Sequence, residues 1–198
     1  MAEEDYSEAV RWLTTGSSGL AKNGWPLSLS ARQLMTSAGL GGIFEMPIYF
    51  VQHGLAVPEE VDPNRPLSAD GRKEVERVAT HLRKVGLSVK QVCHSGKTRA
   101  KETAQILAGQ IGDGNIHAVP GMNPNDPVVA FAAGLKDDHT MYVGHLPHLG
   151  KLVSYLVAGN ENAGAVKFVN GGVVCVERDS TGHHIEWYLK PSLCRDYR

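Results

Sequence analysis

The sequence predicts an α/β domain in which helices flank a mixed central sheet. From residue 46 onward, short runs of β-branched and aromatic residues alternate with amphipathic helical segments. That alternation is typical of a sheet covered by helices. Near the end of the chain, segments 173–177 and 185–189 alternate apolar and polar residues around a Ser-Thr-Gly turn, which indicates a closing antiparallel pair.

The expected strands are short and mostly apolar. The first, 47–51, reads Pro-Ile-Tyr-Phe-Val and leads directly into polar residues, which is typical of a buried strand that feeds a loop. Three further strands are expected at 89–93, 116–119 and 140–143.

Helix signals follow these strands. Ser68 is a suitable N-cap and Asp70 suits the first turn, whereas Gly86 supplies a stop signal. The apolar residues between them recur on one helical face. The other expected helices begin near residue 97, span 126–135, and run from Pro147 to Gly159.

The composition excludes several classes of function. The chain has 198 residues, with 20 Lys and Arg against 21 Asp and Glu and a net charge of −1. This balance favours neither nucleic acid nor an anionic membrane as a partner. The three cysteines are far apart and form no C-x-x-C pair, so we expect reduced thiols, no zinc knuckle and a cytoplasmic location. No apolar run approaches the length of a membrane helix.

The N-terminal segment differs from the rest of the chain in composition and periodicity. Residues 1–45 are rich in Ser, Gly and Thr and show weak periodicity. We expect them to form an N-terminal extension, either the product of a misassigned start or a flexible arm. The functional domain is then expected at 46–198.

Polar residues that could together bind a phosphoryl group follow three of the predicted strands. His53 follows the first, Ser95 and Arg99 follow the second, and His145 follows the strand at 140–143. In open α/β sheets, ligands bind at the carboxyl ends of the strands. A guanidinium offers a planar fork of donors to a phosphoryl group, one histidine can attack phosphorus, and the second can stabilise the developing charge. A lone histidine is more often structural, so the hypothesis depends on the joint pattern.

At these positions the sequence resembles the histidine phosphatase superfamily, specifically its short phosphohistidine phosphatase (SixA-type) branch. The resemblance covers residues 46 to about 189. The matching motifs are Gln52-His53-Gly54, Arg65-Pro66-Leu67-Ser68, Ser95 with Arg99-Ala100 and Thr103, and Gly144-His145-Leu146-Pro147.

The resemblance implies a three-layer α/β/α fold of the phosphoglycerate mutase-like type and a metal-independent phosphatase without cofactors. His53 would be the phosphorylated nucleophile, Arg99 a phosphate clamp and His145 the second pocket histidine. The substrate would be a phosphohistidine on a protein, with phosphate or a similar oxyanion in the pocket. The further residues expected to bind phosphate are Gln52, Gly54, Arg65 and Ser95.

Attack by His53 requires a neutral imidazole with one nitrogen aimed at phosphorus. We expect its other nitrogen to donate to a backbone carbonyl such as that of Gly54.

Two departures from the family pattern affect the activity. Gln52 stands where the family has the first Arg of Arg-His-Gly, and loss of one well-placed donor typically costs about 10²–10³ in rate. In addition, the stretch 121–124 has no carboxylate, whereas relatives that cleave phosphate esters carry a general acid there. An imidazole leaving group needs little protonation, so this departure favours P–N over P–O cleavage.

Other functions remain open from the sequence. Cys93 and Arg99 have the C-x₅-R spacing of cysteine-dependent phosphatases, which leaves both pocket histidines without a role. A nucleotide-binding P-loop fails because Gln91 replaces its first glycine. The histidine pairs 145/148 and 183/184 offer no convincing metal ligand set. A non-catalytic phosphoprotein-binding module, motivated by Gln52, and a small-molecule phosphomonoesterase are the alternative functions.

Overall fold

A computed structural model describes residues 47–135 and 139–194 of the 198-residue chain. The expected extension at 1–45 and the boundary at Met46 lie outside these described residues. Within the described ranges, none of the helices combines the length and the apolar character that crossing a membrane requires.

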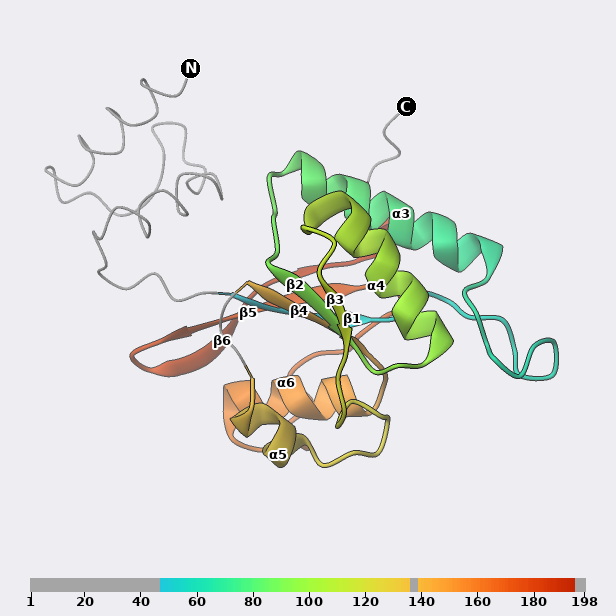
Figure 1. Cartoon of the computed structure of the whole chain (residues 1–198). Helices are drawn as coiled ribbons and strands as arrows, with labels where there is room; N and C mark the ends of the chain where they lie inside the picture. The colour runs from blue at the N-terminus through green and yellow to red at the C-terminus, as the bar shows by residue number, and fades with distance from the viewer. Residues whose placement is uncertain (1–46, 136–138, 195–198) are drawn as a thin grey trace, which may run out of the picture. The chain divides into compact units, whose positions relative to one another are not determined.

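Six strands and four α-helices follow one another along the described chain, and a 3₁₀ turn ends it (Figure 1). The elements are β1 (Ile48–Gln52), α3 (Ala69–Lys84), β2 (Gln91–His94), α4 (Thr98–Ile111), β3 (Ile116–Ala118), α5 (Val128–Ala133), β4 (Thr140–Gly144), α6 (His148–Ala158), β5 (Val173–Asp179), β6 (Gly182–Leu189) and the 3₁₀ turn Pro191–Leu193.

The strands form a single mixed sheet in the order β3-β2-β4-β1-β5-β6. Strands β3, β2, β4 and β1 run parallel to one another, whereas β5 pairs antiparallel with both β1 and β6. Helices α3 and α4 cover one face of the sheet, and α5 and α6 cover the other (Figure 1). The predicted three-layer fold with a mixed central sheet is therefore confirmed.

Several predicted boundaries differ from the structure. The second strand begins at Gln91 rather than residue 89, because Val89 instead forms an isolated bridge with Gly112. The helix expected at 126–135 is shorter, Val128–Ala133. Asp126 precedes it, because its carboxylate accepts hydrogen bonds from the backbone N–H and side-chain amide of Asn123, at 2.8 and 3.0 Å.

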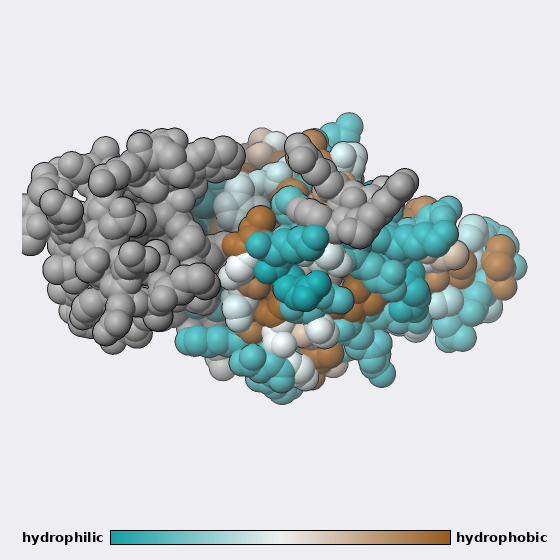
Figure 2. Space-filling view, turned by 90° about the horizontal axis from the view of Figure 1, so that it is seen from above, coloured by the Kyte–Doolittle hydropathy of each residue, from teal (hydrophilic) through white to brown (hydrophobic). Residues whose placement is uncertain are grey.

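The centre of the sheet forms the core. All five residues of β1 are buried, since the strand has neighbours on both sides and helices on both faces. Phe50 stacks on Tyr142 of β4 with ring centroids 6.0 Å apart, and Tyr49 contacts Trp187 of β6 at 5.8 Å. On the side of α3 and α4, hydrophilic surface surrounds smaller hydrophobic patches (Figure 2), as expected for helices that turn one face to a core.

Helix α3 begins against the loop that follows β1. Ser68 caps it as predicted, because its hydroxyl accepts a hydrogen bond from the Gly71 N–H at 3.0 Å. The Leu55 carbonyl accepts from the Ser68 N–H at 2.8 Å. Gly71 lets the two segments meet, since a Cβ at this position would lie 2.1 Å from the Leu55 carbonyl oxygen.

This close approach predicts opposite effects for two glycine-to-alanine substitutions in helices. Gly71→Ala forces α3 away from Leu55, so we expect a loss of about 1–3 kcal/mol in the free energy of unfolding. Gly109→Ala, in α4, meets no atom within 4 Å and is expected to stabilise by up to about 1 kcal/mol, because alanine is the better helix former. Denaturant unfolding of both variants measures the difference. Equal stability changes would contradict the contact.

Candidate active site

The sheet order brings three predicted strand ends together. Strands β2, β4 and β1 are adjacent and parallel, with Gln52 opposite Gly144 and His94 opposite Val143. The residues that follow these strands, His53, Ser95 and His145, therefore lie at one edge of the sheet.

The imidazole of His53 is held through both of its nitrogens. Nδ1 lies 2.7 Å from the Gly54 carbonyl oxygen, and the Arg99 Nε–H donates to Nε2 at 3.1 Å. A guanidinium only donates, so Nε2 must accept and Nδ1 must carry the ring proton. The carbonyl of Gly54 then receives that proton's hydrogen bond, as the sequence analysis expected.

His145 lies beside His53, with ring centroids 4.9 Å apart. Its Nε2 is 2.6 Å from the Ser95 hydroxyl. The ring is almost fully buried, and its Nδ1 has no hydrogen-bond partner among the described residues. Ser95 and the two histidines thus form one contiguous polar cluster.

Both imidazoles are uncharged at neutral pH. Burial lowers the pKa of His53 to about 4, helped by the charges of Arg99 and Arg65, whereas the Gly54 hydrogen bond acts in the opposite direction. Burial also lowers the pKa of His145 to about 3, followed by the effects of His53 and Arg99. Each neutral ring has one unprotonated nitrogen. The site therefore holds two uncharged rings beside fixed cations.

The fixed cations come from two loops and a helix start. Besides Arg99, the charges of Arg65 and Lys97 act on the site histidines. Arg65 adopts a positive φ of 49°, and its buried Nε has no hydrogen-bond partner among the described residues. This concentration of positive charge favours an anionic ligand.

Gln52 is nearly buried next to this cluster. Its Nε2 donates to the Asn170 Oδ1 at 2.9 Å, while its Oε1 is buried without a hydrogen-bond partner among the described residues. The Gly171 N–H donates to the Gln52 carbonyl at 2.9 Å. The sequence analysis missed Asn170. Its only signal was an Asn-Gly-Gly turn sequence before the strand at 173–177.

Gly54 connects the site to helix α4. Its N–H donates to the buried Thr103 hydroxyl at 3.0 Å. A Cβ on Gly54 would lie 2.7 Å from the Val75 Cγ2 and 3.0 Å from the Leu67 Cδ2, so space, rather than backbone conformation, requires glycine here. The sequence analysis included Thr103 in a motif but gave it no role.

The thiol alternative has weak support in the structure. Cys93 is buried in the hydrophobic core cluster with Met122, Tyr142 and Phe50. Its neighbours are thus mainly apolar, whereas reactive thiolates lie in electropositive, partly exposed surroundings.

Two sets of carboxylates lie near histidines outside this cluster, and one further carboxylate, Glu59, acts electrostatically on Arg99. In the turn before α5, Asp126 accepts from Asn123, and its charge acts on His148. Elsewhere, Glu177, His184 and Glu186 on the β5–β6 hairpin have ligand atoms within 4.8 Å of one another and could hold a metal ion. These residues lie beyond the opposite end of β1 from His53. Val173, at the start of β5, lies opposite Val51, and Val176 lies opposite Ile48, so β5 continues past the first residue of β1 before it reaches Glu177.

Sequence comparisons agree with this geometry. Residues 48–123 match the family model of the histidine phosphatase superfamily (branch 1). An uncharacterized protein from Picosynechococcus is 31% identical over 123 residues, which cover 58% of this chain and 74% of that protein.

Solved structures share the fold. The protein histidine phosphatase SixA, solved with tungstate, has a TM-score of 0.64 at 22% identity, covering 74% of this chain and 98% of its own. The alpha-ribazole phosphatase from Shigella flexneri has a TM-score of 0.60 at 14% identity, with 77% and 100% covered. Phosphoglycerate mutase from Plasmodium falciparum has a TM-score of 0.55 at 16% identity, with 75% and 92% covered. The family model and this shared fold together place the chain in the histidine phosphatase superfamily.

Proposed function

We propose that this protein is a phosphatase that removes the phosphoryl group from a phosphohistidine on a protein, through a phospho-His53 intermediate. The observation that carries the proposal is the His53 ring, whose Nδ1 donates to the Gly54 carbonyl while its unprotonated Nε2 lies beside Arg99. A substrate of this kind implies a role in signal transduction in the cytoplasm. We assign the activity to a domain at 46–198.

The reaction needs two displacements at phosphorus. In the first, the Arg99 Nε–H turns from Nε2 to a phosphoryl oxygen and the Nε2 lone pair of His53 forms a bond to phosphorus. The bond to the substrate ring breaks, and that ring takes the electron pair and leaves as a neutral imidazole, because its other nitrogen carries a proton. In the second, water forms a P–O bond, the electron pair of the breaking P–Nε2 bond returns to Nε2, and the water proton passes to the solvent, so that His53 is restored and inorganic phosphate is released. Neither step requires a metal.

The remaining pocket residues would stabilise the transferring group. Arg99 offers guanidinium donors to the phosphoryl oxygens, and Arg65 adds positive charge. We assign to His145 a hydrogen bond from Nε2 to a phosphoryl oxygen, beside the Ser95 hydroxyl that lies 2.6 Å from the same nitrogen. Such preorganised donors act on charge that develops in the transition state.

The proposed leaving group rests on the stretch that follows β3. The stretch Gly121–Pro124 has no carboxylate, and Asp126 is already hydrogen-bonded to Asn123. An alkoxide needs a proton donor, whereas an imidazole departs more readily without one. This supports phosphohistidine as the substrate and makes a small-molecule phosphomonoesterase the weaker candidate.

Gln52 motivates the other candidate, a module that binds phosphoproteins without turnover. Its amide supplies no charge, and one of its donors is occupied by Asn170.

Replacement of the nucleophile tests the proposal directly. In His53→Ala we expect no phosphoenzyme and at least a ~10³-fold loss of turnover, because the proposed mechanism assigns the attack on phosphorus to His53. The measurement is incubation with a phosphohistidine-bearing protein and, separately, with an aryl phosphate. His117→Ala removes an exposed histidine from β3 and serves as the control. A phosphoenzyme that survives in His53→Ala refutes the assignment.

The depressed histidine pKa values predict the acid limb of the pH profile. Protonation of Nε2 abolishes the nucleophile, so activity is lost as the pH falls through the pKa of His53, about 4. At pH 5–8 the ring stays neutral, and kcat/KM for an aryl phosphate should show no loss near 6.5 from this group. An NMR titration of the His53 ring identifies the group. Protonation of His53 near pH 6.5 would contradict the burial effect.

Substitutions at Gln52 separate a weakened enzyme from a binding module. We expect measurable turnover in the unchanged protein and an increase of about 10²-fold in Gln52→Arg, which restores a charged donor. Gln52→Met keeps the side-chain length but removes the donor, so turnover should fall below that of the unchanged protein. If all three proteins bind a phosphohistidine protein but none turns it over, the non-catalytic module is correct.

A further inference from the structure

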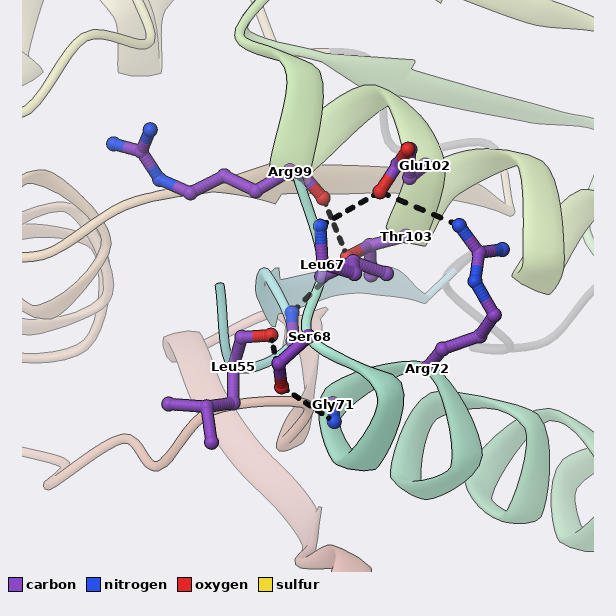
Figure 3. A network of polar contacts seen from close by, with 9 residues as sticks. Leu55, Leu67, Ser68, Gly71, Arg72, Arg99, Glu102 and Thr103 are labelled. Carbon is purple, nitrogen blue, oxygen red and sulfur yellow. Dashed lines mark hydrogen bonds and ion pairs between the residues drawn. The ribbon is translucent and has the colours of Figure 1, made fainter. Parts of the chain in front are cut away.

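The Thr103 hydroxyl bridges the nucleophile loop and the helix that carries Arg99. Thr103 is fully buried. Its Oγ1 accepts from the Gly54 N–H at 3.0 Å and donates to the Arg99 carbonyl at 2.7 Å. Figure 3 shows Thr103 on α4, with the dashed line to the Arg99 carbonyl and Leu67 close by.

The direction of both hydrogen bonds is fixed by chemistry. A carbonyl oxygen can only accept, so the single hydroxyl proton of Thr103 points to Arg99. A backbone N–H can only donate, so the Gly54 N–H must point to a lone pair of the same oxygen. The bridge therefore has one arrangement, and it holds Gly54 at a fixed position relative to α4.

Gly54 is confined on its other sides by α3 and the loop before it. A Cβ there would meet the Val75 Cγ2, the Leu67 Cδ2 and the Gly71 carbonyl at 2.7–3.1 Å. The next residue is fixed as well, because the Leu55 carbonyl accepts from the Ser68 N–H and hydroxyl at 2.8 and 3.1 Å. These contacts limit Gly54 sterically, whereas Thr103 supplies its directional contact from α4.

The Gly54 carbonyl helps to keep the ring proton of His53 on Nδ1. Its hydrogen bond with Nδ1 acts together with the Arg99 Nε–H, which donates to the unprotonated Nε2 at 3.1 Å, since the hydrogen bond at one ring nitrogen sets the state of the other. A histidine without such a partner favours the opposite tautomer, with Nε2 protonated and unable to attack. Any rotation of the Gly54 backbone therefore affects the nucleophile directly.

We propose that Thr103 is a positioning residue that keeps His53 in its Nδ1–H tautomer by fixing Gly54, and that it also sets the distance between His53 and Arg99. Its effect on turnover rests on the proposed function, whereas its effect on the tautomer does not.

The neighbouring Glu102 illustrates how local this role is. Its carboxylate accepts from the Leu67 N–H at 2.7 Å and pairs with Arg72 at 3.4 Å, which ties the start of α3 to α4 (Figure 3). Neither of these two contacts involves Gly54 or His53. The adjacent side chains of one helical turn thus hold different parts of the loop between β1 and α3.

The test compares three substitutions in the full-length protein. Thr103→Val keeps the shape but leaves the Gly54 N–H without its acceptor, and Thr103→Ser restores the hydroxyl. Ser154→Ala is the matched control. Ser154 lies on α6 and is also buried, and its hydroxyl accepts a hydrogen bond from the Ala165 backbone N–H at 3.0 Å. Long-range ¹H–¹⁵N NMR of the imidazoles, assigned with His53→Ala, reports the tautomer of His53 without any substrate.

In the unchanged protein, Thr103→Ser and Ser154→Ala, we expect Nδ1 of His53 to be protonated. In Thr103→Val we expect Nε2–H to become populated and phosphoenzyme formation from an aryl phosphate to slow by about tenfold, as for the loss of one ordinary hydrogen bond. An unchanged tautomer in folded Thr103→Val overturns the proposal, as does an equal change in Ser154→Ala. If the tautomer shifts in Thr103→Val but the unchanged protein itself forms no phosphoenzyme, the positioning role is supported and the proposed function is refuted.

Discussion

The hydrogen bond from His53 Nδ1 to the Gly54 carbonyl is the constraint on which the rest of the site depends. It joins neighbouring residues, at 2.7 Å, so the backbone at Gly54, together with the Arg99 Nε–H at Nε2, decides where the ring points and which nitrogen carries the proton. Everything around Gly54 serves to restrict it, from the crowding by Val75 and Leu67 to the hydroxyl of Thr103. The requirement for glycine is steric, because any side chain would push α3 away from the loop and move the carbonyl that holds the ring.

The electrostatics of the site follow from burial combined with fixed positive charge. Two imidazoles lie 4.9 Å apart, and protonation of either would place a charge in a poorly solvated cluster beside Arg99 and Arg65. Burial is the largest cause of the lowered pKa values of both His53 and His145, and the cations add to it. The same arrangement that excludes a proton from His53 attracts a phosphoryl anion, because an anion is stabilised by the cations that destabilise an imidazolium.

The sequence predicted the fold and the positions of the main polar residues well, for a physical reason. Apolar alternation and turn residues are local, and the carboxyl ends of adjacent parallel strands must meet, so the proximity of His53, Ser95 and His145 follows from strand order alone. The ends of helices were less predictable where a side chain, rather than the backbone, accepts the hydrogen bonds. An example is Asp126, whose carboxylate accepts from the Asn123 N–H in the turn before α5. The contacts of Asn170 and Thr103 were unpredictable, because each joins atoms 118 or 49 residues apart in the chain through a single side-chain atom.

Gln52 shows why a pocket that matches the family motifs at most positions does not by itself define an activity. An arginine at this strand end would bring a charge and two parallel donors to a phosphoryl group, whereas the glutamine amide gives one of its donors to Asn170 and buries an oxygen without a hydrogen-bond partner among the described residues. A buried acceptor without a hydrogen-bond partner is unfavourable. The positive charge of the pocket therefore depends more heavily on Arg99 and Arg65. Since Arg65 lies in the loop between β1 and α3, which α4 holds through the Leu67–Glu102 contact, the packing of these two helices matters for phosphate binding as well as for the nucleophile.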